Sequence, residues 1–312
     1  MVSKTRVRPL LKPRALPPGG TLAVVAPAGP VDLAQLEKGA ECWRSAGFRV
    51  RWCDDIAAHC GYLAGSDERR AREFIECVRN PEIDAVVCAR GGYGSQRLFS
   101  LLDAEVVRRA AKPLVGFSDA TALLLWQMRC AGLIGFHGPM LQRQAPLAQE
   151  EFGWLCELLT GAGDAERRLC GRPGGGGCVA GPLVGGSLSL VLASLGTPWE
   201  IETEGAILLL EEVNEPPYRI DRMLHQLWVA GKLAVVAGVG LGTFEACVDP
   251  RRAEPTAETV AEDILRRAGV AWVSGLPFGH GVPNFAWPVG GQARLDADAG
   301  ELWISERAVK RD

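Results

Sequence analysis

The first half of the chain alternates short apolar runs with segments in which apolar residues recur at helical spacing. This pattern predicts strands over 21–29, 83–90 and 112–117, and helices over 32–46, 67–79 and 120–131. Strands that alternate with helices of this length are typical of a parallel sheet covered by helices. The first half therefore predicts an N-terminal α/β domain with a parallel sheet.

The second half has a denser strand pattern. Apolar runs predict strands over 206–213, 234–244, 292–298 and 301–305, with a helix over 256–268. A further helix is expected over 218–231, because its apolar residues fall on one face: Ile220, Met223, Leu224, Leu227 and Trp228. These elements predict a strand-rich C-terminal α/β domain.

A glycine-rich segment lies between the two halves. Residues 171–181 include six glycines, which predicts that the segment holds no regular element. We therefore expect an N-terminal domain over 1–145, a linker region over 146–180 and a C-terminal domain over 181–312.

Charge and hydropathy narrow the classes of partner. The 312 residues carry 34 basic and 37 acidic side chains in an interleaved order, which disfavours nucleic acid as a partner. The basic N-terminus lacks the apolar run of a secretory signal. No later segment reaches the roughly 18 apolar residues that span a bilayer. We expect a soluble, cytoplasmic protein without a membrane partner.

Cysteine and histidine spacing argues against a metal. None of the ten cysteines stands in a C-x-x-C pair, and the four histidines are scattered singly. We therefore expect neither a metal nor another cofactor.

Ser118 is the candidate nucleophile. It stands in Gly116-Phe117-Ser118-Asp119-Ala120, where a predicted strand ends and a predicted helix begins. Small residues around a serine in this context are typical of the nucleophile elbow of hydrolases. The alternative is that Ser118 only caps the helix.

A glycine turn at 90–94 ends the neighbouring predicted strand. Glycines let backbone N–H groups approach a ligand closely. With the N–H of Asp119, this turn is a candidate oxyanion hole. The alternative is a tight connection that binds nothing.

A nucleophilic serine needs a base and a group that orients the base. His280 stands in a loop-like stretch, whereas His137 follows a predicted strand near the nucleophile and competes with it. His225 lies away from the apolar face of its helix, and His59 has no supporting context.

The orienting acid has two candidates. Glu211 and Glu212 end an apolar strand, where a carboxylate is costly unless it is paired. Either residue could orient the base, and the alternative is that both are surface acids at the end of the strand.

Six segments in one order resemble the LD-carboxypeptidase family of serine peptidases, which includes muramoyl-tetrapeptide carboxypeptidases and the microcin C immunity peptidase. The resemblance covers nearly the whole chain. The segments are VAPAGPV (25–31), RGGYG (90–94), GFSD (116–119), HGPM (137–140), LLLEEVNEPPYRIDRML (208–224) and GHGVPNFAWPVG (279–290).

The resemblance implies roles for single residues. It assigns Ser118 as nucleophile, Glu211 as acid and His280 as base, with the backbone N–H groups of Gly92 and Asp119 as the oxyanion hole. It also implies an active site between the two domains, and a homodimer. One departure is Ser187, where family members often have asparagine.

The resemblance also implies a reaction. We expect a small peptide substrate, with release of a C-terminal D-amino acid from murein tetrapeptide during cell-wall recycling. Arg90 is a candidate clamp for the terminal carboxylate and Arg219 a weaker one. The first alternative is cleavage of the amide of peptidyl or aminoacyl nucleotide analogues, as in microcin immunity. The second is a non-catalytic protein that binds a ligand in a cleft.

Overall fold

The computed structural model describes residues 10–143 and 147–311, and its chain divides into two units. The sequence of the basic N-terminus was expected to lack a secretory signal. Its residues 1–9 lie outside the described residues. Unit 1 comprises residues 1–163, 286–288 and 307–312, and unit 2 comprises 164–285 and 289–306. The chain thus leaves unit 1 after Gly163 and returns to it twice.

Unit 1 is built on a six-stranded sheet with the order β12-β5-β4-β3-β1-β2. The pairs from β2 to β5 are all parallel. Residues of β1, β3, β4 and β5 are buried on both faces, as expected of a sheet that helices cover on both sides. The strands are β1 (Thr21–Val25), β2 (Arg49–Arg51), β3 (Ala85–Cys88), β4 (Leu114–Gly116), β5 (Gly135–His137) and β12 (Trp287–Val289).

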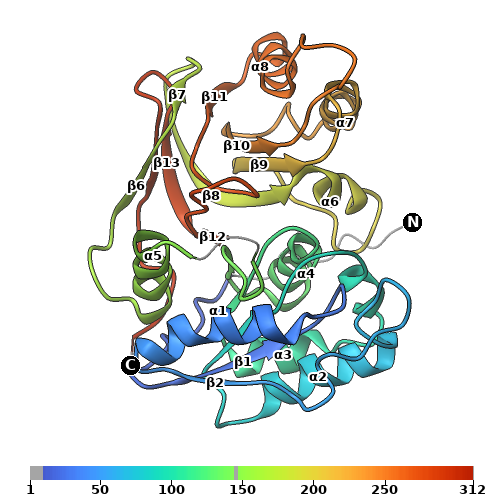
Figure 1. Ribbon diagram of the computed structural model, residues 1–312. Helices are drawn as coiled ribbons and strands as arrows, with labels where there is room; N and C mark the ends of the chain where they lie inside the picture. Colours follow the sequence, from blue (N-terminus) through green and yellow to red (C-terminus); the bar gives the residue numbers. More distant parts are fainter. Residues whose placement is uncertain (1–9, 144–146, 312) are drawn as a thin grey trace. The chain divides into compact units, whose positions relative to one another are not determined.

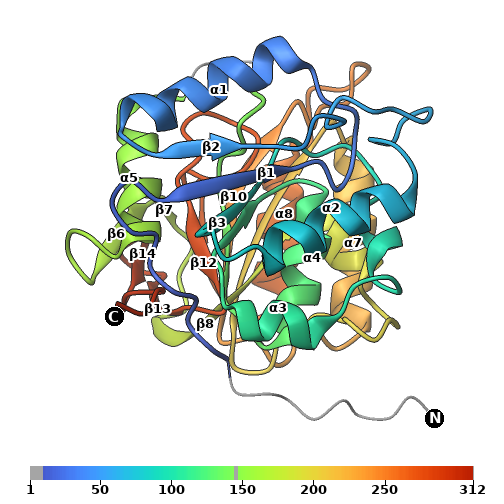
Figure 2. The ribbon, with the colours of Figure 1, turned by 90° about the horizontal axis from the view of Figure 1, so that it is seen from below.

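Helices cover this sheet in two layers, which Figure 2 shows from the edge. The face of α1 and α5 carries a core that includes Trp43 and Phe152, whose rings meet edge to face. The other face carries α2, α3 and α4. The bounds are α1 (Leu33–Ser45), α2 (Asp67–Arg79), α3 (Ala104–Ala110), α4 (Ala120–Trp126), which continues as a π-helical turn over Gln127–Ala131, and α5 (Gln149–Thr160); a short 3-10 helix spans Ser95–Leu98. Unit 1 is the α/β domain that the sequence pattern predicts.

Unit 2 is built on an eight-stranded mixed sheet with the order β6-β14-β13-β8-β9-β10-β11-β7. Strands β8 to β11 run parallel, while the pairs outside them are antiparallel. The strands are β6 (Arg167–Cys170), β7 (Arg172–Pro173), β8 (Cys178–Ser187), β9 (Ile207–Val213), β10 (Gly238–Glu245), β11 (Ala271–Ser274), β13 (Gln292–Asp296) and β14 (Glu301–Ile304).

Three helices lie along the parallel strands of unit 2 (Figure 1). They are α6 (Leu188–Ala193), α7 (Pro217–Val229) and α8 (Ala257–Ala268). The face of α7 predicted to be apolar buries Ile220, Leu224 and Leu227. The strand-rich α/β architecture expected for the second half is confirmed.

The expectation that residues 171–181 hold no regular element is wrong, because they contain β7 and the start of β8. The glycines permit close approach of neighbouring strands. A Cβ on Gly181 would lie 2.1 Å from the carbonyl oxygen of Gly205, and one on Gly176 would lie 2.6 Å from Cα of Ala271. Glycine content alone does not separate a flexible linker from crowded strands.

Within residues 10–143 and 147–311, no helix combines the length and the apolar character that crossing a bilayer requires.

Candidate active site

Ser118 lies on a strained turn between β4 and α4. Its φ of 59° is in the left-handed region, which is unusual for a residue other than glycine. The N-cap position of α4 belongs to Asp119 instead. A Cβ on Gly116 would lie 2.7 Å from Cβ of Ala120, so the turn needs a glycine there. The strand-turn-helix elbow predicted from the sequence is present.

The glycine turn passes directly over this serine. A Cβ on Gly91 would lie 2.8 Å from both Cβ and Oγ of Ser118, and 3.5 Å from the backbone nitrogen of Asp119. Gly92 follows with a φ of 121° and is exposed. The structure therefore brings the candidate nucleophile Ser118 next to the glycine turn and Asp119, the two parts of the expected oxyanion hole.

The side chain of Asp119 fixes the far end of the turn. Its buried carboxylate accepts hydrogen bonds from the backbone N–H groups of Gly94 (3.1 Å) and Ser95 (2.9 Å). The hydroxyl of Ser95 donates to the carbonyl oxygen of Asp119 at 2.9 Å. The far end of the turn is thus tied to the residue that follows the nucleophile.

Arg70 is a second support that the sequence analysis missed. This fully buried α2 residue donates to the carbonyl oxygens of Gly94, at 2.9 Å, and of Pro27, and it pairs with Asp67. The signal available in the sequence was an arginine on the inward face of an amphipathic helix. A buried charge there is costly unless partners surround it.

Two arginines were candidate carboxylate clamps. A guanidinium nitrogen of Arg90 donates to the carbonyl oxygen of Pro30 at 3.1 Å, which links the glycine turn to the loop after β1. Arg219 is exposed and pairs with Glu215 at 3.0 Å. Arg90 therefore has at least a structural role.

In unit 2, His280 and Glu211 form a close pair. Nδ1 of His280 lies 2.7 Å from Oε2 of Glu211, with side-chain exposures of 19% and 0%. A histidine that donates from Nδ1 keeps its acceptor lone pair on Nε2, as a general base requires. A Cβ on Gly279 would lie 2.8 Å from Cβ of Glu211, so only glycine permits this approach.

Two polar side chains hold the loop that carries His280. Oγ1 of Thr243 accepts from the N–H of Gly281 at 3.0 Å and donates to the carbonyl oxygen of Phe278 at 3.3 Å. Asn284 is buried and its Oδ1 accepts from the N–H of Gly279 at 3.0 Å. Thr243 lies where the pairing of β9 and β10 shifts register, and such bulges redirect side chains.

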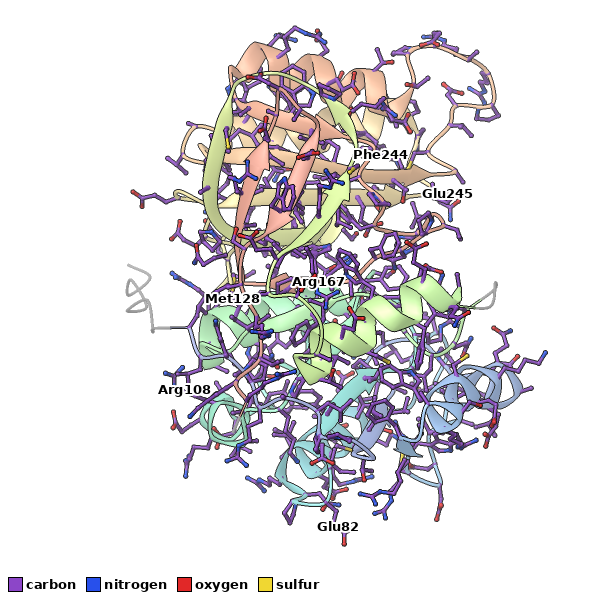
Figure 3. All side chains as sticks on the ribbon, turned by 90° about the vertical axis from the view of Figure 1, so that its left-hand side faces the viewer. Glu82, Arg108, Met128, Arg167, Phe244 and Glu245 are labelled. Atoms are coloured by element: carbon purple, nitrogen blue, oxygen red, sulfur yellow. The ribbon has the colours of Figure 1, made fainter. Side chains whose placement is uncertain are left out.

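Nearby carboxylates control the protonation of His280. Burial disfavours its charged form, but the hydrogen bond and charge of Glu211, with the charges of Glu212 and Glu245, together raise the pKa of His280 above the ordinary value. Glu245 is the last residue of β10 and is labelled in Figure 3. Among the groups that raise this pKa, Glu211 has the largest effect.

The two glutamates point to different partners, because successive residues of a strand face opposite sides. Glu212 turns away from His280 and accepts the N–H of Ser189 at 2.7 Å, at the start of α6. Burial raises the pKa of Glu212, although hydrogen bonds from the backbone of Val213 and Ser189 oppose the rise. Ser187, the departure from the family pattern, lies 3.5 Å from the Glu212 carboxylate.

The other histidines have different surroundings. His137 is fully buried in β5 and stacks on Trp287, with ring centroids 4.9 Å apart. His225 and His59 are exposed. In the described part of the chain, no group of three or more His, Cys, Asp or Glu side chains is placed to hold a metal ion.

A serine on such an elbow in an α/β protein is typical of the class of serine hydrolases. Residues 22–138 match the LD-carboxypeptidase N-terminal domain, and residues 180–295 match the LD-carboxypeptidase C-terminal domain. The chain therefore belongs to the LD-carboxypeptidase family, and it is a serine-type hydrolase with carboxypeptidase activity.

Relatives match along nearly their whole length. A putative carboxypeptidase of Synechocystis sp. is 40% identical over 94% of this chain and 96% of its own. The murein tetrapeptide carboxypeptidase of Pseudomonas aeruginosa is 32% identical, over 90% of this chain and 95% of its own.

Solved structures share the fold. The muramoyltetrapeptide carboxypeptidase of Oxalobacter formigenes has a TM-score of 0.82 and 30% identity, and the match covers 91% of this chain and 97% of that one. MccF in complex with glutamyl sulfamoyl guanosine has a TM-score of 0.88, covering 96% of this chain and 100% of that one. At 23% identity, the second likeness concerns the fold alone.

Proposed function

We propose that this enzyme hydrolyses an L,D-peptide bond and releases the C-terminal D-amino acid of a murein tetrapeptide. The observation that carries the proposal is the left-handed Ser118, with a φ of 59°, beneath the Gly91 turn. Backbone strain of this kind persists where function requires it. The names of the relatives from P. aeruginosa and O. formigenes support the choice of substrate.

The proposed mechanism assigns a role to each group. His280 takes the proton of Ser118 as Oγ attacks the scissile carbonyl carbon, and Glu211 stabilises the imidazolium that forms. The N–H groups of Gly92 and Asp119 bind the oxyanion. The C–N bond then breaks, His280 protonates the leaving amine, and water hydrolyses the acyl-enzyme with His280 again as base.

The proposal extends to the setting of the reaction. Turnover of murein tetrapeptide would belong to cell-wall recycling in the cytoplasm, with the enzyme as a homodimer. Light scattering on the purified protein measures the oligomeric state. A monomer at micromolar concentration would contradict the proposed homodimer.

Ser118→Ala tests the nucleophile. We expect turnover of the tetrapeptide to be abolished with the fold unchanged, because only the attacking hydroxyl is removed. Ser45→Ala, at an exposed position of α1, is the matched control. If the Ser118 variant turned over the tetrapeptide at the wild-type rate, Ser118 would not be the nucleophile.

A pair of substrates tests the exopeptidase assignment. The enzyme should cleave the tetrapeptide acid several-fold to a hundredfold faster in kcat/KM than its C-terminal amide, because a clamp such as Arg90 would lose a charged partner, at a cost of about 1–3 kcal/mol. Equal rates on acid and amide, with faster turnover of a peptidyl adenylate analogue, would favour the microcin-immunity type of reaction.

A further inference from the structure

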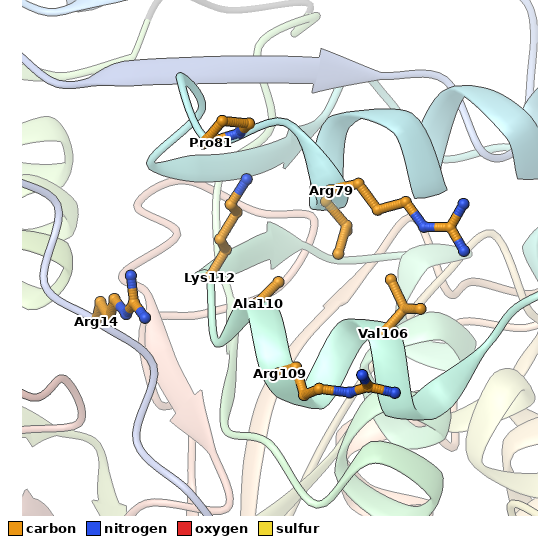
Figure 4. A pocket seen from close by; sticks show the side chains of 8 residues that line it. Arg14, Arg79, Pro81, Val106, Arg109, Ala110 and Lys112 are labelled. Carbon is orange, nitrogen blue, oxygen red and sulfur yellow. The ribbon is translucent and has the colours of Figure 1, made fainter.

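Unit 1 has a hollow, shown in Figure 4, with a volume of about 340 Å³. It is lined by the end of α2, by α3, and by the segments before β3 and β4, together with Arg14 from the N-terminal stretch. Its volume lies at the lower end of the range typical of small-molecule sites.

The hollow is separate from the candidate active site. Pro81 precedes β3 and Lys112 precedes β4, so the hollow lies at the amino ends of these parallel strands. Ser118 follows the carboxyl end of β4, so it lies at the opposite end of these strands. The hollow therefore calls for a separate explanation.

Four cationic side chains line the hollow, and no acidic one does: Arg14, Arg79, Arg109 and Lys112. Arg109 has one loose, exposed pair with Glu105, at 3.5 Å. Among the described residues, no carboxylate forms an ion pair with Arg14 or Arg79 within 4.0 Å. Within this described part of the chain, no ion pair therefore compensates Arg14 or Arg79, while the charge of Asp84 acts on Lys112.

Helix capping accounts for only part of this charge. Cations favour the carboxyl ends of helices, and Nζ of Lys112 donates to the carbonyl oxygens of Cys77 (3.1 Å) and Asn80 (2.5 Å) at the end of α2. Burial lowers the pKa of Lys112, the charges of Cys77 and Asp84 oppose this effect, and the charge of Arg14 adds a smaller contribution to it.

Arg108 and Arg109 show the difference between structural and available cations. Arg108, labelled in Figure 3, donates to the carbonyl oxygens of Ala131 and Gly132 at 2.9 and 3.0 Å. Arg109 instead extends along the hollow, and Val106 lies between it and Arg79 in Figure 4. Two guanidinium groups with an apolar side chain between them suit an anion that also carries an apolar part.

We propose that this hollow binds a small phosphate-bearing molecule. Guanidinium groups form paired, charge-assisted hydrogen bonds with phosphate oxygens, and a phosphate offers several acceptors and up to two charges at one centre. Arg79 and Arg109 would donate these bonds, while Arg14 and Lys112 would supply further positive charge. Val78, Val106 and Ala110 would contact the rest of the molecule.

Titration calorimetry with inorganic pyrophosphate tests the proposal on the full chain. We expect saturable binding at one site, with a Kd tighter than about 1 mM. Arg79→Gln combined with Arg109→Gln should weaken binding at least tenfold. Both side chains are exposed, so the fold should persist. Arg51→Gln combined with Arg72→Gln removes the same charge from exposed positions outside the hollow and should bind as the wild type does.

A thermal shift gives a second measure, because a ligand that binds the native state raises Tm. Pyrophosphate should raise the Tm of the wild type and of the control pair, and not that of the Arg79 and Arg109 pair. Three results would overturn the proposal: no saturable binding by the wild type, equal weakening in both pairs, or citrate binding as tightly as pyrophosphate at the same ionic strength.

Discussion

At the scale of single residues, the buried carboxylate of Glu211 determines when His280 can act. A general base must be unprotonated, so kcat/KM should rise with pH through the raised pKa of His280. Burial lowers this pKa and the carboxylates raise it. Removing the main carboxylate should therefore move the ascending limb to lower pH.

Glu211→Gln tests the direction of this change in the pKa of His280. The ascending limb of the kcat/KM profile should shift to lower pH, while the plateau falls by roughly 10²–10⁴-fold, less than for His280→Ala. Glu212→Gln should shift the limb less, since Glu212 bonds to the start of α6 and acts on His280 only through its charge. A limb that moves to higher pH in the Glu211 variant would contradict the assignment.

Because Gly91 has no side chain, it leaves the space that the side chain of Ser118 occupies. Gly91→Ala would place a Cβ 2.8 Å from Oγ of Ser118, so we expect kcat to fall about tenfold or more. Gly153→Ala is the control, since a Cβ there meets nothing within 4 Å in α5. It should stabilise unit 1 by about 0.5–1 kcal/mol. An unchanged kcat in the Gly91 variant would show that the turn does not constrain Ser118.

At the scale of elements, the hydroxyl of Thr243 is one of the groups that hold the loop of His280. Thr243→Val removes an acceptor for Gly281 and a donor to Phe278, at a cost of about 1–3 kcal/mol. We expect kcat to fall with little change in KM, because the base loses its position and the substrate keeps its contacts.

Thr203→Val is the matched control for this loop. The buried Thr203 hydroxyl donates to the carbonyl oxygen of Lys232 at 2.9 Å, in the same unit. Its loss should lower stability by a similar amount and leave kcat unchanged. The urea midpoint of unit 2 measures the stability of each variant. An equal loss of kcat in both variants would mean that Thr243 acts only through the stability of unit 2.

The elements also show how far sequence pattern reaches. The helix predicted over 67–79 has these bounds in the structure as α2, because Ser66 caps its start and an apolar stripe follows. Strand β8 was missed because its glycines suppress the apolar signal while allowing close strand contacts. Periodicity reports burial of apolar side chains, and it carries no information where backbone packs on backbone.

The same limit applies to the site. A serine between a strand and a helix is visible in the sequence, whereas Arg70 and Thr243 act on backbone atoms distant along the chain. Arg70 reaches the carbonyl oxygens of Pro27 and Gly94, a contact that spacing cannot predict. Choosing Glu211 over Glu212 from the residues alone requires knowing which face of β9 meets the loop of His280.

At the scale of the whole molecule, the last residues of the chain belong to unit 1. Lys310 donates its N–H to the carbonyl oxygen of Pro13 at 2.7 Å and accepts from Ala15 at 2.9 Å, while Ala308 and Val309 are buried. Deleting residues 307–312 should therefore destabilise unit 1 selectively. Hydrogen exchange should accelerate at residues 11–16 and stay unchanged in unit 2. Deleting only 311–312 is the control, and equal exchange in the two deletions would contradict the prediction.

The position of strand β12 in the sequence affects how the chain folds while it is being translated. This strand is the neighbour of β5 in the sheet of unit 1, yet most of unit 2, residues 164–285, is encoded between them. At about 5–20 residues per second, a ribosome would need on the order of ten to thirty seconds to reach β12 after β5 has been made. During that interval β5 is an unpaired edge, which can pair with a strand of another chain. The nascent protein is therefore most exposed to aggregation while its second unit is being translated.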